Sequence, residues 1–265
     1  LCGQEIITVF SPDKPYTVYC NPCWWSDKWD ASEFAIDYNE SKNFFDQFRE
    51  LQQKVPQMAL VVTYPTMVNS DYTNFAGHLK NCYFVFNSND DENCAYLDKA
   101  VFSNECLDNS ILYKCELCYE NINIEKSQNV HFSEDIESSH DIYFSKNLIG
   151  CSNCFGCVNL RNKQSHIFNK PYTPEEYKNK LADYKLDSCT AIQQMLPQVR
   201  EFWSKYPQRH IRGRHNINVS GDYIYNSKNV HQSYIAHDVE DSKYVQWIHT
   251  KPTKNAYDYT EWGRG

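Results

Sequence analysis

Between residues 70 and 169, small and apolar residues recur at every third position. Eight cysteines share this one phase: Cys82, Cys94, Cys106, Cys115, Cys118, Cys151, Cys154 and Cys157. A helix repeats at 3.6 residues and a flat strand at 2, so a period of three fits neither element. A longer period of twelve residues is also present, because Cys82, Cys94, Cys106 and Cys118 follow one another at intervals of twelve residues. Four inward positions in every twelve residues predict a narrow β-solenoid built from twelve-residue coils.

The residue directly before an inward position is often Asn or Asp in this region. The examples are Asn81, Asn93, Asn129, Asp141 and Asn153. Both residue types tolerate left-handed backbone conformations and hydrogen-bond their own backbone, so we expect tight turns at these positions. Stacked coils lie about 4.8 Å apart, and eight of them would form a rod on the order of 40 Å long.

Aromatic side chains occupy the outward positions of the same region. They include Tyr83, Phe84, Tyr96, Tyr119, Phe132, Tyr143 and Phe144. A large aromatic surface is covered by another part of the chain or by a partner protein. We expect the chain to cover part of it, and these seven residues are the candidate partner face.

After Asn169 the triplet pattern stops and a helical pattern begins. The segment Thr173-Pro174-Glu175-Glu176 combines an N-cap, a proline at the first helical position and the glutamate of a capping box. A second amphipathic segment runs from Ile192 to Trp203, where Pro197 either kinks the helix or marks its start. Triplets then resume between Ile224 and Val245, which predicts two to three further coils.

The N-terminal segment carries a metal-ligand pattern. Cys20-Asn21-Pro22-Cys23 is a C-x-x-C pair, and Cys2 lies eighteen residues before it. This spacing predicts a structural Zn²⁺ held by Cys2, Cys20 and Cys23, with a fourth ligand from a cysteine preceding Cys2 or from a nearby histidine. A free or disulfide-bonded trio is the alternative. We expect Ser41 to cap a helix with Phe44, Phe45, Phe48 and Leu51 on one face, packed on the first coil.

The expected fold is therefore mainly β, a narrow solenoid with a zinc-ribbon-like cap and a helical insertion. The predicted segments are 1–33 (zinc-ribbon-like domain), 34–69 (helix and linker capping the solenoid), 70–169 (solenoid), 170–215 (helical insertion) and 216–265 (solenoid continuation and tail).

Two resemblances accompany these patterns. The segment Ser11-Pro12-Asp13-Lys14-Pro15-Tyr16, the segment Cys23-Trp24-Trp25-Ser26-Asp27-Lys28-Trp29-Asp30 and the repeat resemble uncharacterised cysteine-rich zinc-ribbon and repeat proteins of uncultured bacteria and phages, which implies no activity. The coil geometry also resembles the twelve-residue coils of insect antifreeze proteins. Those proteins expose regular threonine ranks, whereas this chain exposes aromatic residues, which argues against ice binding.

Composition limits the chemistry. The chain has 265 residues and a formal net charge of −8, and this charge disfavours non-specific adhesion to nucleic acid or anionic lipid. It has 8 glycines, which makes a phosphate-binding glycine loop hard to build. No apolar run is long enough to span a bilayer and no secretory signal is visible, so we expect the cytoplasm or a virion as location and no membrane partner.

Three weaker signals remain. Asp108 and Glu120 share an outward column, where two carboxylates would lie about 5 Å apart, as in some glycosidases. Cys151, Cys154 and Cys157 are either free buried thiols, which we favour, or a disulfide or metal-binding cluster. A basic stretch interleaved with aromatic residues is a candidate nucleic-acid surface, against a solvated helix end and loop: Arg200, Lys205, Arg209, Arg212 and Arg214.

We therefore predict a non-enzymatic structural or protein-binding rod with a protein as partner, and a larger assembly such as a virus particle is one setting for it. A nucleic-acid-binding protein using 200–215 and the zinc ribbon is the first alternative. A carbohydrate-active enzyme on the solenoid wall is the second.

Overall fold

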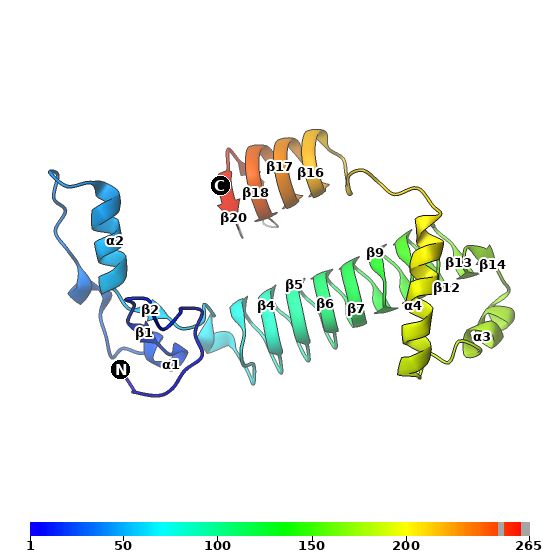
Figure 1. Cartoon of the computed structure of the whole chain (residues 1–265), viewed down its shortest axis with the longest axis horizontal. Helices are drawn as coiled ribbons and strands as arrows, with labels where there is room; N and C mark the ends of the chain where they lie inside the picture. The colour runs from blue at the N-terminus through cyan, green and yellow to red at the C-terminus, as the bar shows by residue number, and fades with distance from the viewer. Residues whose placement is uncertain (249–251, 261–265) are drawn as a thin grey trace. The chain divides into compact units, whose positions relative to one another are not determined.

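The computed structural model describes residues 1–248 and 252–260. The chain divides into two compact units, Leu1–Tyr206 and Pro207–Gly265, and it is mainly β. The helices are α1 (Asn21–Trp24), α2 (Phe44–Lys54), α3 (Pro174–Ala182) and α4 (Cys189–Ser204), with short 3-10 helices at Ala31–Phe34 and Tyr64–Thr66 (Figure 1).

The first unit contains two sheets. A small one pairs β1 (Val18–Tyr19) in parallel with β2 (Gln57–Met58). The large one contains β3 (Asn74–Gly77), β4 (Tyr83–Asn89), β5 (Ala95–Val101), β6 (Leu107–Tyr113), β7 (Glu116–Glu125), β8 (Gln128–His131), β9 (Glu134–Glu137), β10 (His140–Tyr143), β11 (Lys146–Ile149), β12 (Ser152–Phe155), β13 (Gln164–Ile167) and β14 (Lys170–Pro171).

Parallel pairing with a constant offset organises the large sheet. Val85 pairs with Leu97, and Ile142 pairs with Cys154, each twelve residues further along the chain. After β7 two ladders run on in parallel, because one half of this strand pairs with β8 and the other with β9. The predicted period of twelve is thus the register of the strand pairs.

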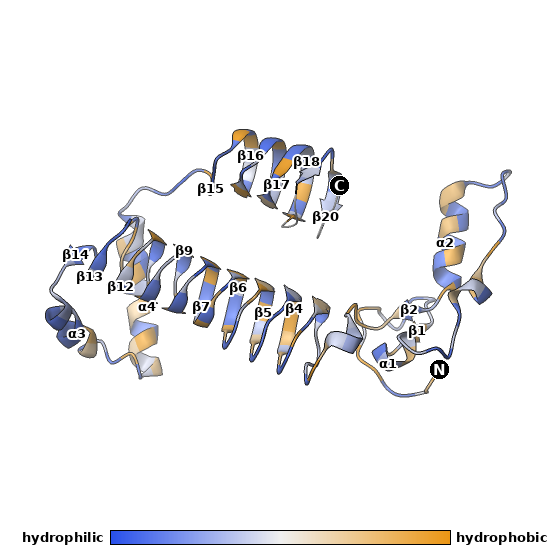
Figure 2. Ribbon diagram, turned by 180° about the vertical axis from the view of Figure 1, so that it is seen from behind, coloured by the Kyte–Doolittle hydropathy of each residue, from blue (hydrophilic) through white to orange (hydrophobic). Residues whose placement is uncertain are grey.

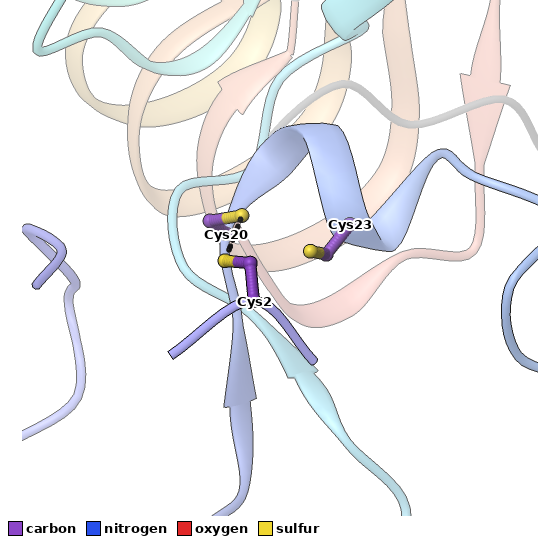
Figure 3. Close-up of side chains that lie close together, drawn as sticks. All are labelled: Cys2, Cys20 and Cys23. Atoms are coloured by element: carbon purple, nitrogen blue, oxygen red, sulfur yellow. Dashed lines mark hydrogen bonds between the residues drawn. The ribbon is translucent and has the colours of Figure 1, made fainter. Parts of the chain in front are cut away.

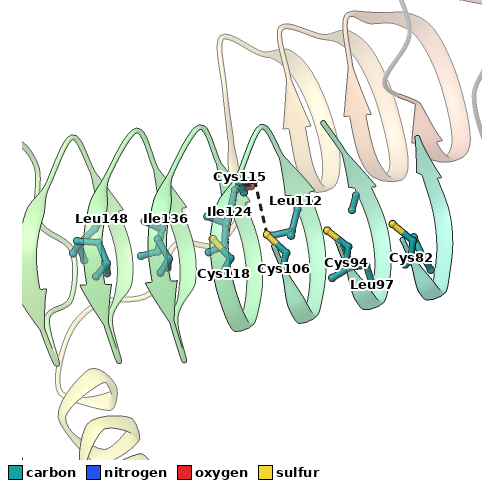
Figure 4. Close-up of a cluster of buried hydrophobic side chains, with 14 of the residues drawn as sticks. Cys82, Cys94, Leu97, Cys106, Leu112, Cys115, Cys118, Ile124, Ile136 and Leu148 are labelled. Carbon is teal, nitrogen blue, oxygen red and sulfur yellow. Dashed lines mark hydrogen bonds between the residues drawn. The ribbon is translucent and has the colours of Figure 1, made fainter. Parts of the chain in front are cut away.

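From Thr73 to Cys157 every third residue is buried. Cys82, Cys94, Cys106 and Cys118 are each at most 2% exposed and belong to the same cluster (Figure 4). Their shared burial confirms the prediction that these four cysteines face one interior. The polar members of the interior are also bonded: the Ser133 hydroxyl donates to the carbonyl of His131 at 2.8 Å and accepts from the backbone N–H of Ser145 at 3.0 Å.

The residue before each buried position adopts a left-handed conformation. Asn81 and Asn93 have φ of 53° and 54°, and the amide of Asn81 donates to Oδ1 of Asn93 at 3.0 Å. These values confirm the expected left-handed conformation. Asn129, Asp141 and Asn153 are also left-handed, but they lie inside β8, β10 and β12, where we expected tight turns. The same conformation occurs at residues for which it is less favourable, such as Ile111 with φ 62°. A branched Cβ crowds the backbone of its own residue in the left-handed region.

The N-terminal end of the stack is closed by the cysteine-containing segment. The indole Nε1 of Trp25 donates to the carbonyl of Val62 at 3.2 Å, and Val62 bridges to Ala76 at the first repeat. The expectation that the helix after Ser41 packs on the first repeat is wrong, because the Phe residues of α2 are exposed. Its cap is Asn43, whose side chain accepts from the backbone N–H of Phe45 at 2.9 Å.

The other end of the stack is closed by a reversal and two helices. Strand β14 pairs antiparallel with β13, and its Pro171 has no N–H to offer a further strand. Thr173 then forms the predicted capping box with Glu176 at the start of α3. Helix α4 runs through Pro197 from its N-cap Ser188.

The second unit repeats the parallel pairing less regularly. It contains β15 (Gly213–Arg214), β16 (Ile217–Tyr225), β17 (Lys228–His237), β18 (Val239–Ile248), β19 (Thr253–Lys254) and β20 (Tyr257–Thr260). The offset is eleven at Val219↔Val230 and twelve at Ile224↔Ala236, and it is fourteen at Val239↔Thr253. Pairing begins at Gly213, inside the segment 170–215 that we predicted as helical insertion, because α4 already ends at Ser204.

No helix among residues 1–248 and 252–260 combines the length and apolarity needed to cross a membrane.

Candidate metal centre and partner surface

Three cysteines meet at the N-terminal end of the first unit. Cys20 follows β1 and is the N-cap residue of α1, and Cys23 lies inside α1. Cys2 reaches them from the start of the chain, so the ligand atoms of all three lie within 4.8 Å of one another (Figure 3). The sequence prediction therefore selected the three residues that the fold brings together.

The distances suit a tetrahedral thiolate site. Zinc–sulfur bonds of about 2.3 Å place two sulfurs of a tetrahedron roughly 3.8 Å apart. The Sγ atoms of Cys2 and Cys20 are 3.6 Å apart. Three soft ligands of this kind provide three corners of the tetrahedron, and no His, Asp or Glu belongs to the group within the part of the chain that the structure describes.

The electrostatics of the three thiols differ. Hydrogen bonds from the backbone at Gln4 and then from the thiols of Cys23 and Cys20 lower the pKa of Cys2 to about 7. The Cys20 thiol first, then burial and the Cys2 thiol, raise the pKa of Cys23. Cys2 can thus form a thiolate near neutral pH, and a bound cation would favour ionisation of Cys23.

Helices α3 and α4 cover one part of the predicted aromatic face. Phe144 is fully buried and Phe132 and Tyr143 are partly buried in a cluster with residues of both helices. The α4 contribution comes mainly from Met195, Val199 and Trp203, which are spaced four residues apart. We call Phe132, Tyr143, Phe144 and Phe155 the covered wall. Phe144 is therefore not available to a partner, which corrects its assignment to the partner face, and Phe132 and Tyr143 are partly covered.

The N-terminal part of the same face remains open. Tyr72, Tyr83, Phe84 and Tyr96 are 41%, 43%, 41% and 51% exposed. Their rings contact one another, with centroids 5.4 Å apart for Tyr72 and Tyr83 and 6.0 Å for Phe84 and Tyr96. We call these four residues the exposed aromatic cluster. Tyr119 lies between the exposed aromatic cluster and the covered wall. It is half-buried, and its ring centroid is 5.3 Å from that of Phe132.

The inner cysteines are buried free thiols. Cys151, Cys154 and Cys157 are free and at most 1% exposed. The thiol of Cys157 donates to the carbonyl of Phe155 at 3.4 Å. The neighbouring Cys106 thiol and burial raise the pKa of Cys94 to about 12. Such thiols act as small hydrophobic groups with a weak donor, as the sequence analysis favoured.

The basic stretch is divided between the two units. Arg200 and Lys205 belong to the first unit, whereas Arg209, Arg212 and Arg214 belong to the second. Arg212 pairs with Asp222 at 2.6 Å, and Lys205 pairs with Glu201 at 2.9 Å. The guanidinium of Arg214 lies over the ring of Tyr225 at 5.8 Å. Several of these cations are thus engaged within the chain, which weakens the nucleic-acid hypothesis.

Glu120 of the carboxylate pair borders a small hollow. Asp108 and Glu120 are both exposed, and both, Glu120 first, raise the pKa of Tyr119. The hollow that Glu120 lines beside Leu196 and Trp203 has a volume of about 120 Å³, below the roughly 300–1,000 Å³ of ordinary ligand sites.

For two features the sequence identified the residues but not their surroundings. The Phe face of α2 was expected to be packed on the first coil and is exposed. Asp91 is a charged residue type in the inward column, and the structure buries it to 1% exposure.

Comparison with known proteins gives little further information. No protein-family model matches the chain, and no curated protein matches it. One solved structure with some likeness is described as "putative acetyltransferase from Desulfovibrio desulfuricans G20", with 10% sequence identity and a TM-score of 0.16. The alignment covers 72% of this chain and 57% of that chain. At this TM-score the likeness supports no conclusion about fold or function, and no family is assigned.

Proposed function

We propose that this chain is a non-enzymatic β-solenoid that binds another protein through the exposed aromatic cluster, and that a structural zinc ion closes its N-terminal end. The observation that carries the proposal is the repetition of one surface along the wall. Phe84 and Tyr96 precede Phe132 and Phe144 by 48 residues, which is four repeats. The covered wall takes an amphipathic helix, and the exposed cluster presents the same residue types in the same columns.

The solenoid is supported by the pairing. Strand partners twelve residues apart, a buried side chain at every third residue and a left-handed residue before each of them are what a coil with four short sides requires. A stack of this kind is rigid and needs its two ends blocked, because open strand edges would otherwise pair with other chains.

The size of the exposed cluster suits an interface. Four rings about half exposed, at roughly 200 Å² for a whole aromatic side chain, present about 350 Å² of mainly apolar surface. Contiguous patches of about 300–600 Å² on a protein surface are often functional. Tyr also offers a hydroxyl at its outer end, which suits a contact that is apolar at the centre and polar at the rim.

Zinc is supported by the chemistry of the three ligands. Cys2, Cys20 and Cys23 would hold the ion, and water or another ligand would take the fourth position. The ion would supply no catalysis. It would fix the segment that carries Trp25 and thereby the contact of that indole with the first repeat.

Photo-cross-linking tests the partner surface. A photoreactive phenylalanine analogue at position 84 is expected to capture a protein partner, and the pair Tyr83→Ser and Phe84→Ser is expected to abolish affinity capture of that partner. Phe102→Ser is the matched control, because Phe102 is 50% exposed and contacts Tyr113 instead of the cluster. Equal loss of capture in Phe102→Ser, or undiminished capture in the double variant, would contradict the proposal.

A further inference from the structure

Helix α2 is an amphipathic helix whose apolar face has no partner among the described residues. Phe44, Phe45 and Phe48 are 57%, 71% and 53% exposed. Their rings form a continuous surface, with centroids 5.4 Å apart for Phe44 and Phe45 and 6.2 Å for Phe44 and Phe48. In Figure 2 the ribbon of α2 alternates between hydrophobic (orange) and hydrophilic (blue) residues. Leaving three adjacent Phe rings in water is costly, so the face calls for an occupant.

Another face of α2 is held by its own chain. The Gln47 side chain is 7% exposed; its carbonyl accepts from the backbone N–H of Asn39 at 2.8 Å, and its amide donates to the carbonyl of Asn39 at 3.0 Å. The ammonium of Lys54 donates to the carbonyl of Ala35 at 3.2 Å. These hydrogen bonds fix the rotation of α2 about its axis, and they thereby hold the Phe face toward solvent.

The covered wall shows how this type of surface receives a helix. In α4 the side chains that enter the aromatic cluster, Met195, Val199 and Trp203, recur every fourth residue. In α2, Phe44 and Phe48 have the same spacing. The exposed aromatic cluster therefore corresponds to the covered wall, and α2 corresponds to α4. Within one chain both the cluster and the Phe face of α2 remain exposed.

We infer that the occupant of the exposed aromatic cluster is α2 of a second copy of this chain, so that two copies exchange helices in a two-fold dimer. This inference rests on the proposed function and names its partner. A two-fold axis makes the contact twice, since each chain contributes one helix and one cluster.

The buried area is sufficient. The exposed parts of the four cluster rings and the three Phe rings amount to roughly 700 Å² for one contact and roughly 1,400 Å² for two. Stable interfaces bury about 1,200–2,000 Å² in total. One contact alone falls short of this range, so the reciprocal arrangement is the one that the areas favour.

Charge does not oppose the association. The charged residues of α2 are Asp46, Arg49, Glu50 and Lys54, which sum to zero. Near the cluster, Lys80 pairs with Glu92 at 2.6 Å and Lys99 pairs with Asp98 at 2.5 Å. The two surfaces are locally balanced, although the whole chain carries −8.

Sedimentation equilibrium of the full chain tests the inference. We expect a mass of twice 31.3 kDa for the unmodified chain. The helix variant Phe44→Ser with Phe48→Ser and the cluster variant Phe84→Ser with Tyr96→Ser are each expected to raise the dimer Kd at least about 100-fold. Phe102→Ser should leave the Kd unchanged.

Mixing the two variants separates a lost contact from a lost fold. A helix variant and a cluster variant together retain one intact pair of α2 and cluster, whereas either variant alone retains none. We therefore expect the mixture to associate at least about tenfold more tightly than either variant by itself.

Three outcomes would overturn the inference: a monomeric unmodified chain, a dimer that the helix variant leaves intact, or a mixture no tighter than its components. If the chain is monomeric while the cross-link at position 84 still captures a different protein, the dimer is refuted and the proposed protein-binding function stands. If that capture also fails, both are refuted.

Discussion

Replacing the buried Asp91 by Asn is expected to stabilise the protein at neutral pH. Oδ1 of Asp91 accepts from the backbone N–H of Ser103 at 2.7 Å, whereas Oδ2 is buried without a hydrogen-bond partner among the described residues. Asn109, eighteen residues later, is another polar residue at an inward position, one and a half repeats along the stack. Its Oδ1 accepts from the N–H of Asn121, and its Nδ2 donates to the carbonyls of Leu107 and Cys118 at 2.7 and 2.9 Å.

The comparison of the two residues identifies what Asp91 lacks. At Asn109 one side-chain atom acts as an acceptor and the other as a donor. An ionised carboxylate has no donor, so Asp91 must keep a proton or leave Oδ2 unsatisfied. Burial accordingly raises the pKa of Asp91 from 3.8 to about 8, and the nearby Cys82 and Asp90 add to the rise.

The sign and size of the effect follow from this pKa. Between pH 4 and pH 8 the folded chain holds a proton on Asp91 that the unfolded chain has released. This contribution to stability is complete below the unfolded pKa and is lost as the pH rises toward 8, at about 1.4 kcal/mol for each pH unit. The Asp91→Asn variant has no such loss. Its advantage over the unmodified chain should therefore grow by about 3 kcal/mol between pH 5 and pH 7.

Urea unfolding of both chains at pH 5, 6 and 7, with the thiols kept reduced, measures this difference. All other titrating groups are common to the two chains and cancel in it. The reverse substitution, Asn109→Asp, should introduce the same pH dependence where none exists. Parallel stability curves for Asp91→Asn and the unmodified chain would refute the reasoning, because they would mean that Asp91 is ionised in the folded state.

Three further substitutions test the backbone, the metal centre and the wall. Ile111→Asn should raise the unfolding free energy by about 1 kcal/mol, because Asn tolerates the left-handed conformation better than a branched residue. The control is Ile122→Asn, at an exposed position outside that conformation. An equal gain in the control would contradict the explanation. Cys20→Ser should abolish zinc bound after dialysis, measured by elemental analysis, while Cys189→Ser retains it; zinc retained by the first variant would exclude the site. Gly156→Ala should lower the unfolding free energy by roughly 1–3 kcal/mol, since φ is +64° and the added Cβ would lie 2.8 Å from an aromatic ring; an unchanged urea midpoint would show that the ring moves freely.

Local sequence patterns were sufficient for the interior and its turns. The triplet phase of the cysteines predicted which side chains are buried, because a side chain's direction depends on the backbone conformation of its own few residues. The left-handed Asn81 and Asn93 and the capping box at Thr173 followed from the same kind of local preference. The C-x-x-C spacing likewise anticipated that Cys20 and Cys23 meet Cys2, since a short turn fixes the distance between the first two.

Only the tertiary structure decided which outward residues are available. Phe84 and Phe144 occupy one column and are indistinguishable in the sequence pattern, yet the first is exposed and the second is buried because α4, from Cys189 onward, covers it. The exposed face of α2 and the missing donor beside Asp91 have the same origin. Whether a side chain is covered or hydrogen-bonded depends on residues that lie far along the chain and arrive only when it has folded, and no local period records their position.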